Sequence, residues 1–227
     1  MKVALLLPGL NRSAIKCYEA LNRCLLSKYD VDIYIHTWDN IHTDEASIDE
    51  VCNLYKPKSI IVEDYKSKTN DLNTKFQGFK IEGSCIPERS ISMFYKNSQC
   101  FKMVDDSYDI YIRSRIDVLL EDNFNIEDLD VSCINVPNPN VGKDTTLVDN
   151  FYSSYVNDSH GIIDAIAAGN YENMSKYMNA YDNLNYMCND LGLMFHPEYL
   201  TLQNLKIQNV NISRFDLNFC LYRKAGS

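Results

Sequence analysis

Residues 3–7 form an unbroken apolar run, Val-Ala-Leu-Leu-Leu, which is followed at once by Pro8 and Gly9. A short run without polar interruptions is typical of a strand buried on both faces, because a solvated face would require alternating polar residues. Strands of that kind belong to parallel sheets with helices on both sides. The run therefore constrains the chain to an α/β architecture whose first strand ends near Pro8.

The rest of the chain alternates between short apolar runs and segments with helical spacing. Further strands are expected at residues 31–35, 59–62, 108–112, 131–136, 210–212 and 219–222. Helices are expected at residues 13–27, 47–54, 87–104, 162–168, 172–187 and 199–204, and a long loop at residues 65–84. This alternation predicts a mostly parallel central sheet flanked by helices. The length of 227 residues suits one domain.

Composition excludes several classes of function. The formal net charge of -9 disfavours nucleic acid as a partner, because an acidic surface repels phosphate backbones. The sequence has no apolar stretch long enough for a membrane span. None of the eight cysteines forms a CxxC pair, which favours free thiols in a reducing compartment. We therefore expect a cytoplasmic protein.

Several polar or glycine-containing segments directly follow the expected strands. They are residues 9–12, residues 36–40, Asp64 and residues 113–117. In parallel α/β sheets, ligands bind beyond the carboxyl ends of the strands. We therefore expect these segments to converge at one edge of the sheet.

The strongest local signal is the segment in which Arg113, Arg115 and Asp117 occupy alternate positions after an apolar strand. If the backbone stays extended, the three side chains point to one side of the sheet. Three charges beside a core destabilise a fold unless they pair with one another or bind a ligand. One interpretation is an internal salt bridge. The other is a site in which Asp117 binds a divalent cation and the arginines face phosphates or a sugar.

The stretch YDIYIRSRIDV at residues 108–118 resembles the YDxxIRxRxD stretch of a group of GT-A glycosyltransferase-like proteins of polysaccharide gene clusters and large DNA viruses. Other features agree in order: the apolar strand with its Pro/Gly/Arg loop, a strand ending in His-Thr-Trp, a helix near residues 92–104, and a late His-Pro-Glu. The resemblance covers most of the chain. It implies a Rossmann-like GT-A fold, with about residues 1–120 binding a nucleotide sugar and about residues 121–227 binding the acceptor. It also implies polysaccharide biosynthesis in the cytoplasm, or in the host cytoplasm if the chain is viral.

The resemblance also implies roles for individual residues. The nucleotide of the related fold lies at the loop after the first strand, which here contains Pro8, Gly9, Asn11 and Arg12. Asp64 ends the third expected strand, where such enzymes often bind the base or ribose; a surface carboxylate is the alternative. Arg115 stands where the first aspartate of an aspartate-x-aspartate motif is expected, so one carboxylate, Asp117, remains for Mn²⁺ or Mg²⁺. Arg115 could then take over part of the charge neutralisation.

Two further groups of polar side chains are candidates for ligand binding. Ser92, Lys96 and Gln99 are spaced i, i+4, i+7, so they share one helix face. This face either is solvated or lies under the nucleotide sugar, with Lys96 on the phosphate. His36 and Thr37 precede the single tryptophan at the end of an expected strand. These residues either contact the ligand, with the tryptophan stacked on a base or sugar, or pack in the core.

Two later residues complete the expected site. An inverting transferase needs a carboxylate that takes the proton of the acceptor hydroxyl, and similar enzymes place this base in the part of the chain that contains Asp149. Asp144 is the second candidate, and a helix N-cap is the alternative role of Asp149. His196 is either a further metal ligand, as a late histidine is in some GT-A enzymes, or part of a structural turn. Glu198 either caps the following helix or orients His196.

Together these features predict a glycosyltransferase that moves a sugar from a nucleoside diphosphate sugar to a glycan or other hydroxyl acceptor. The side chains expected to neutralise the diphosphate are Arg12, Lys96, Arg113 and Arg115. Asp117 would hold the metal ion and Asp149 would be the base. One alternative is a degenerate GT-A-like module that only binds nucleotide or glycan. Another is a different nucleotide-binding α/β enzyme, either a nucleotidyltransferase or a phosphohydrolase.

Overall fold

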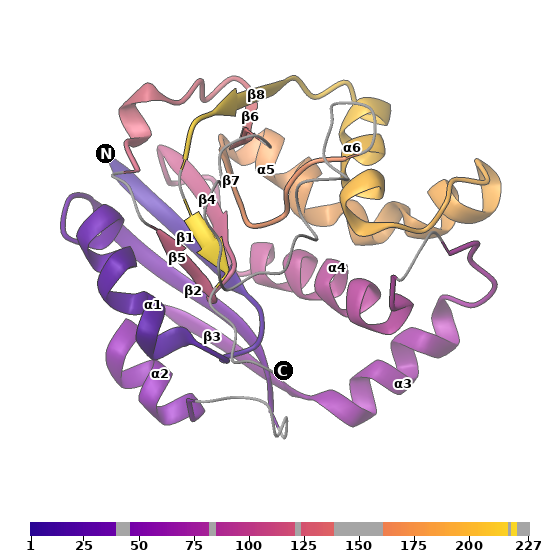
Figure 1. The fold of residues 1–227 in the computed structure, drawn as a ribbon, viewed down its shortest axis with the longest axis horizontal. Helices are drawn as coiled ribbons and strands as arrows, with labels where there is room; N and C mark the ends of the chain where they lie inside the picture. Colours follow the sequence, from indigo (N-terminus) through magenta and orange to yellow (C-terminus); the bar gives the residue numbers. More distant parts are fainter. Residues whose placement is uncertain (40–45, 82–84, 121–123, 139–160, 218, 222–227) are drawn as a thin grey trace.

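The computed structural model describes residues 1–39, 46–81, 85–120, 124–138, 161–217 and 219–221 (Figure 1). Its centre is a seven-stranded sheet with the strand order β3-β2-β1-β4-β7-β6-β8. These strands are β1 (Lys2–Pro8), β2 (Asp30–Asp39), β3 (Ser59–Asp64), β4 (Ile110–Ser114), β6 (Ile134–Pro137), β7 (Ile166–Gly169) and β8 (Ile212–Phe215). Neighbours pair in parallel except at β7, which is antiparallel to β4 and β6. In a separate two-stranded sheet, β5 (Val118–Leu120) pairs with β9 (Phe219–Leu221).

Helices flank both faces of the large sheet. They are α1 (Ala14–Leu21), α2 (Ile48–Tyr55), α3 (Tyr65–Lys75), α4 (Pro87–Phe101), α5 (Tyr171–Met178) and α6 (Pro197–Ile207). Figure 1 shows α1 and α2 on one side of β1 and β2, and α4, α5 and α6 on the other. Short 3-10 or π turns span Asn22–Leu26, Ile126–Asp128, Asn179–Asn183 and Tyr186–Asp190. The prediction of an α/β fold with a mostly parallel sheet between helices is therefore confirmed.

Strand β1 is buried on both faces, as its apolar run predicts. Val3, Leu5 and Leu7 pack in one cluster with residues of α1 and α2, whereas Ala4 and Leu6 pack in a second cluster with residues of α4, α5 and α6. None of the five is more than 1% exposed. Burial of a leucine side chain stabilises a fold by about 1.5–3 kcal/mol, so β1 anchors both helical layers.

The strand order reverses beside β1. From β1 the chain proceeds to β2 and β3 toward one edge of the sheet, and β4 then pairs with the opposite side of β1. The connections after β1 and β4 therefore leave the sheet in opposite directions from neighbouring positions. Open α/β sheets bind their ligands where the strand order reverses in this way.

Two segments differ from the sequence-based expectation. Part of the loop expected at residues 65–84 is the helix α3, which begins after Asp64; the Asp64 carboxylate accepts a hydrogen bond from the Ser67 backbone N–H at 2.8 Å. Within α3 only Thr69 and Leu72 are buried, so the helix has no apolar stripe that would reveal it. The helix expected at residues 162–168 is also wrong, because this segment leads into the strand β7. A short apolar run is compatible with either structure.

Other elements are confirmed with shifted ends. Strand β2 continues through Asp39, so His36 and Thr37 lie inside the strand and not beyond it. The helix expected at residues 172–187 is divided into α5 and two shorter turns. Within the described ranges, none of the helices combines the length and apolar character that a membrane span requires.

Candidate functional site

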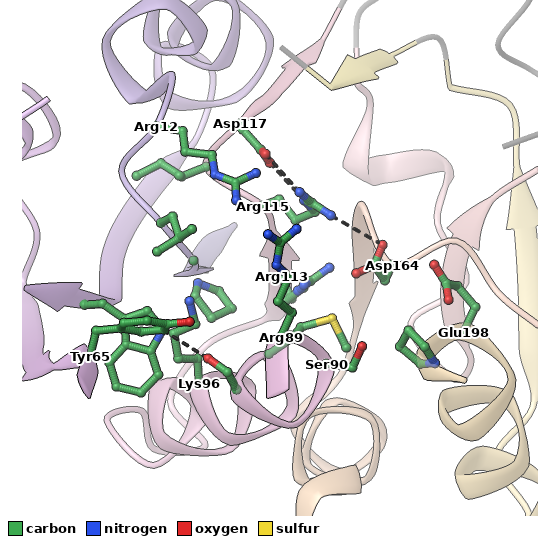
Figure 2. Close-up of a pocket in the computed structure, with 18 residues that line it drawn as sticks. Arg12, Tyr65, Arg89, Ser90, Lys96, Arg113, Arg115, Asp117, Asp164 and Glu198 are labelled. Atoms are coloured by element: carbon green, nitrogen blue, oxygen red, sulfur yellow. Dashed lines mark hydrogen bonds and ion pairs between the residues drawn. The ribbon is translucent and has the colours of Figure 1, made fainter. Parts of the chain in front are cut away.

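A cavity of about 490 Å³ opens at the carboxyl ends of β1 and β4, where the strand order reverses (Figure 2). Its walls come from the loop after β1, the end of β4, one face of α4, the segment before β7 and the start of α6. Of the segments expected to converge, residues 9–12, 36–40 and 113–117 each contribute to the lining. Three of the four segments therefore reach the cavity, whereas Asp64 does not.

Arg113, in β4, is the most deeply buried charge of the cavity. Its side chain is 1% exposed, and its Nε and Nη1 atoms have no hydrogen-bond partner among the described residues. The alternation along β4 directs Arg113 to the same face as Tyr111, which packs with α4 and α5. Buried N–H groups of a guanidinium that have no acceptor destabilise a fold. Arg113 is therefore the clearest sign of an anionic ligand.

Arg115 is held by carboxylates on two sides. Its Nε donates to Asp117 Oδ1 and its Nη2 to Asp117 Oδ2, both at 2.9 Å, while its Nη1 lies 3.8 Å from Asp164 Oδ1. The Arg115 backbone N–H donates to the Ala165 carbonyl at 2.9 Å, which fixes its position beside β7. Strand β4 ends at Ser114, so the backbone is not extended to Asp117 as expected. All three charged side chains nevertheless line the cavity.

The loop after β1 contributes Pro8, Gly9, Leu10 and Arg12 to the lining. The Gly9 N–H donates to the His36 carbonyl at 3.0 Å, which ties the loop to β2. Figure 2 shows the guanidinium of Arg12 directed toward those of Arg113 and Arg115.

One face of α4 forms another wall. Arg89, Ser92, Met93 and Lys96 line the cavity, and their spacing of i, i+3, i+4 and i+7 places them on one stripe. Pro87 begins this helix at a position that tolerates proline, because the missing N–H is not needed there. Ser92 and Lys96 are buried in the cavity wall, so the alternative of a solvated face is wrong for them, whereas Gln99, one turn further along, is not among the lining residues.

Aromatic side chains close the cavity beside α4. Trp38 lines it and donates its Nε1–H to Ser92 Oγ at 3.1 Å. The Trp38 ring stacks on Tyr95 with a centroid distance of 6.1 Å and meets Tyr65, which also lines the cavity, edge to face at 6.0 Å. The Lys96 Nζ atom lies 5.2 Å above the Trp38 ring. The tryptophan therefore packs in the core with a satisfied N–H, which is one of its two expected roles, and it also forms part of the cavity wall. Its stacking on a base or sugar stays a prediction.

Asp164 and Glu198 bring carboxylates to the far side of the cavity. The sequence analysis did not identify Asp164, because it predicted a helix at residues 162–168. The segment instead leads into β7, which runs antiparallel to β4. The pairing of Ser114 with Ile166 places the start of β7 at the carboxyl end of β4. A single carboxylate in the apolar run at residues 162–168 was the available signal, since buried charges require partners.

Glu198 has the most strongly altered acidity in the cavity. Burial raises the pKa of its carboxyl to about 7, and the negative charge of Asp164 acts in the same direction. His196 Nδ1 lies 3.1 Å from Glu198 Oε2. Gly161 packs closely against this part of α6. A Cβ atom at residue 161 would lie only 2.8 Å from Glu198 Cβ.

Several residues expected in the site are not part of the lining: Asn11, His36, Thr37, Asp64, Gln99 and His196. His36 is buried and hydrogen-bonds Glu63 Oε2 through Nε2 at 2.8 Å, and burial lowers its pKa to about 4. Thr37 is buried as well. Asp64 caps α3. The candidate bases Asp149 and Asp144 lie outside the described residues.

The described carboxylates and histidines do not fit a resident divalent metal. Both oxygens of Asp117 accept hydrogen bonds from Arg115, and His196 lies against Glu198. Over the ranges that the structure describes, no three His, Cys, Asp or Glu side chains are grouped so that they could hold a metal ion. We therefore derive no chemical step through Mn²⁺ or Mg²⁺.

Comparisons with known proteins give little further information. No model of a known protein family matches the sequence, and neither does any curated protein. Among solved structures, the apo crystal structure of mouse xyloside xylosyltransferase 1 is similar over 95% of this chain and 84% of that chain. The sequence identity is 13% and the TM-score is 0.44.

Proposed function

We propose that this chain binds a nucleoside diphosphate sugar in the cavity and transfers the sugar to a hydroxyl group of a glycan or another acceptor. The observation that carries this proposal is Arg113, which is 1% exposed and has two N–H groups without partners at the reversal of strand order. Phosphate oxygens would supply the missing acceptors, and charge-assisted hydrogen bonds of this kind are strong.

The distribution of charge supports a ligand with two different ends. Five cationic side chains line the cavity, namely Arg12, Arg89, Lys96, Arg113 and Arg115. Asp164 and Glu198 lie together on the other side of Arg115 (Figure 2). A diphosphate fits the cationic part, while sugar hydroxyls can donate hydrogen bonds to the carboxylates. Trp38 and Tyr65 add aromatic surface suited to a base.

The same arrangement suits the chemistry of glycosyl transfer. The acceptor oxygen forms a bond to the anomeric carbon while the bond from this carbon to the diphosphate breaks, and the electron pair leaves with the diphosphate. Guanidinium groups stabilise the charge that develops on this leaving group. The proton of the acceptor hydroxyl passes to a carboxylate, for which Asp149 remains our proposed residue.

A panel of UDP- and GDP-sugars tests the proposal by thermal shift, with and without Mn²⁺. We expect at least one donor to raise the unfolding midpoint of the native protein, because a ligand that binds only the folded state stabilises it. Arg113→Met should abolish this shift. If no donor shifts the native protein under either condition, the proposal is wrong.

Product analysis separates the proposed activity from its alternatives. A transferase releases nucleoside diphosphate from the donor only when an acceptor is present, whereas a phosphohydrolase needs no acceptor. A nucleotidyltransferase releases pyrophosphate from a nucleoside triphosphate. A degenerate module binds the donor and releases nothing.

A further inference from the structure

Two carboxylates from separate elements hold one guanidinium in the cavity. Asp117 follows β4, Asp164 precedes β7, and Arg115 lies between them. The side chains of Arg115, Asp117 and Asp164 are 19%, 6% and 8% exposed, so this trio is mostly shielded from water. Two partly buried carboxylates whose oxygens face each other commonly bind a divalent cation between them. Here the cation between them is a side chain of the same chain.

A metal ion at this position would have to replace a well-formed pair. Arg115 binds Asp117 through two parallel N–H···O bonds of 2.9 Å, a bidentate geometry that guanidinium and carboxylate groups adopt when they interact strongly. Breaking that pair would leave a buried charge without its partner, which destabilises a fold. The described part of the chain also offers no group of three metal-binding side chains as compensation.

The paired guanidinium lies where its charge can act on an anion. Arg115 lines the cavity together with Arg113, and the pair with Asp117 fixes its position there. Figure 2 shows Arg115 beside Arg113, with Arg12 directed to the same space. Arg113 adds its Nε and Nη1 donors, which have no acceptor among the described residues. A diphosphate at this point would therefore meet several guanidinium groups at once.

We propose that Arg115, fixed by Asp117 and Asp164, takes the place of a divalent cation, and that this chain binds the diphosphate of its ligand without a metal ion. The inference rests on the proposed function, since it concerns how the same diphosphate is neutralised. Asp117 is then a positioning residue for Arg115 and not a metal ligand.

Calorimetric titration of UDP, GDP and pyrophosphate into the native protein tests the inference, once in excess EDTA and once with Mn²⁺. We expect the dissociation constants under the two conditions to agree within about threefold, because the chain supplies the positive charge itself. Binding that requires Mn²⁺ would overturn the inference but leave the proposed function standing. If no probe binds under either condition, both are overturned.

Substitution of Arg115 gives the second readout. Arg115→Met should weaken binding in EDTA by roughly tenfold or more, because a charged hydrogen-bond donor is lost. Mn²⁺ should restore part of that binding in this variant, since Asp117 and Asp164 are released from their pair. Unchanged binding of Arg115→Met in EDTA would contradict the inference.

Two controls accompany this experiment. Arg115→Lys keeps the charge but not the bidentate geometry, so in EDTA it should bind the diphosphate probes more tightly than Arg115→Met. It also serves as the folded variant if Arg115→Met unfolds. Arg23→Met removes an exposed arginine that does not line the cavity, and it should bind as the native protein does. Equal loss of binding in Arg115→Lys and Arg115→Met, with both folded, would contradict a role for the positive charge at residue 115, and native-like binding of both would contradict the inference as well.

Discussion

Arg113 carries a full charge at a position where the described residues offer its Nε and Nη1 no acceptor. A methionine of similar length fills the same space without a charge or a polar atom that needs a partner. Replacing buried charged groups by apolar side chains often stabilises a protein. Arg113 therefore lowers the stability of the protein without ligand but favours the binding of an anion.

We predict that Arg113→Met raises the free energy of unfolding by about 1–3 kcal/mol and weakens nucleoside diphosphate binding at least about tenfold. Urea denaturation and calorimetry measure the two effects on the same samples. Arg23→Met, on an exposed site, is the matched control and should change the free energy of unfolding by less than about 0.5 kcal/mol. A variant less stable than the native protein would show that the guanidinium is satisfied in the empty state.

Glu198 gives a second prediction at the scale of the residue. Burial, followed by the charge of Asp164, raises the pKa of its carboxyl from 4.5 to about 7. The folded protein thus holds this proton more tightly than the unfolded chain does. The resulting stability is fully present below pH 4.5 and is lost as the pH rises through about 7. Between about pH 5 and 8 this group should lower the free energy of unfolding by about 1–3 kcal/mol.

The difference between the native protein and Glu198→Gln isolates this contribution in urea titrations from about pH 5 to about pH 8. The variant is needed because His36 also makes the free energy of unfolding depend on pH, in the opposite direction. Burial lowers the pKa of His36 to about 4, so its contribution to the free energy of unfolding is present above pH 6.5 and is lost as the pH falls from 6.5 toward about 4. Glu172→Gln is the control, because Glu172 is an exposed carboxylate with a lowered pKa and should keep the native slope. Identical slopes for the native protein and Glu198→Gln would contradict the prediction.

The sequence predicts the residues of the cavity best where they follow strands of the parallel part of the sheet. Arg113, Arg115 and Asp117 could be identified because alternate charges after an apolar strand are rarely without partners. Asp164 could not, because its place depends on an antiparallel pairing that no local pattern specifies. The role of Asp117 could not be decided from the sequence either, since a carboxylate two residues after an arginine can form an ion pair or bind a metal ion.

At the scale of the element, the start of α6 is held by a contact that only glycine permits. A Cβ atom on residue 161 would lie 2.8 Å from Glu198 Cβ and 2.9 Å from the Glu198 carbonyl carbon. The Ile162 N–H also donates to the Glu198 carbonyl at 3.3 Å. Because backbone atoms cannot rotate out of the way, an added methyl group has to displace the first turn of α6.

We predict that Gly161→Ala lowers the free energy of unfolding by about 1–3 kcal/mol, as overpacking in a closed site usually does. Gly9→Ala is the matched control for stability, since its Cβ atom would meet only Ile116 Cγ2 at 3.9 Å, an ordinary contact distance. Urea denaturation of the two variants gives the comparison. If both variants unfold at the same urea concentration, the contact at residue 161 does not constrain α6.

The elements also show where sequence patterns are sufficient for the fold. The strands β1 to β4 and the helix α4 are predictable because each has a clear apolar run or stripe. Helix α3 is not predictable in this way, since almost all of its residues are polar. The sequence marks its start through Asp64, which caps the helix. Strand β7 is not predictable in this way either, because four buried residues, Ile166–Gly169, are too few to show a period.

At the scale of the whole molecule, two electrostatic effects on an anionic ligand oppose each other. The chain has a formal net charge of -9, which repels a diphosphate at long range. The cavity itself has five cationic side chains against the carboxylates of Asp117, Asp164 and Glu198. At about 0.1 M salt, charges are screened beyond about 10 Å, so the repulsion from the surface weakens while the close contacts persist.

We predict that the close contacts dominate, so that UDP affinity falls by roughly tenfold when NaCl rises from about 50 mM to about 500 mM. Calorimetric titration at several salt concentrations measures this slope, and the neutral nucleoside uridine serves as the control with no dependence on salt. An affinity for UDP that increases with salt would mean that repulsion by the net charge outweighs the cavity. That result would contradict the prediction that contacts with Arg113 and Arg115 dominate, because attraction between groups in contact weakens as counterions compete for them.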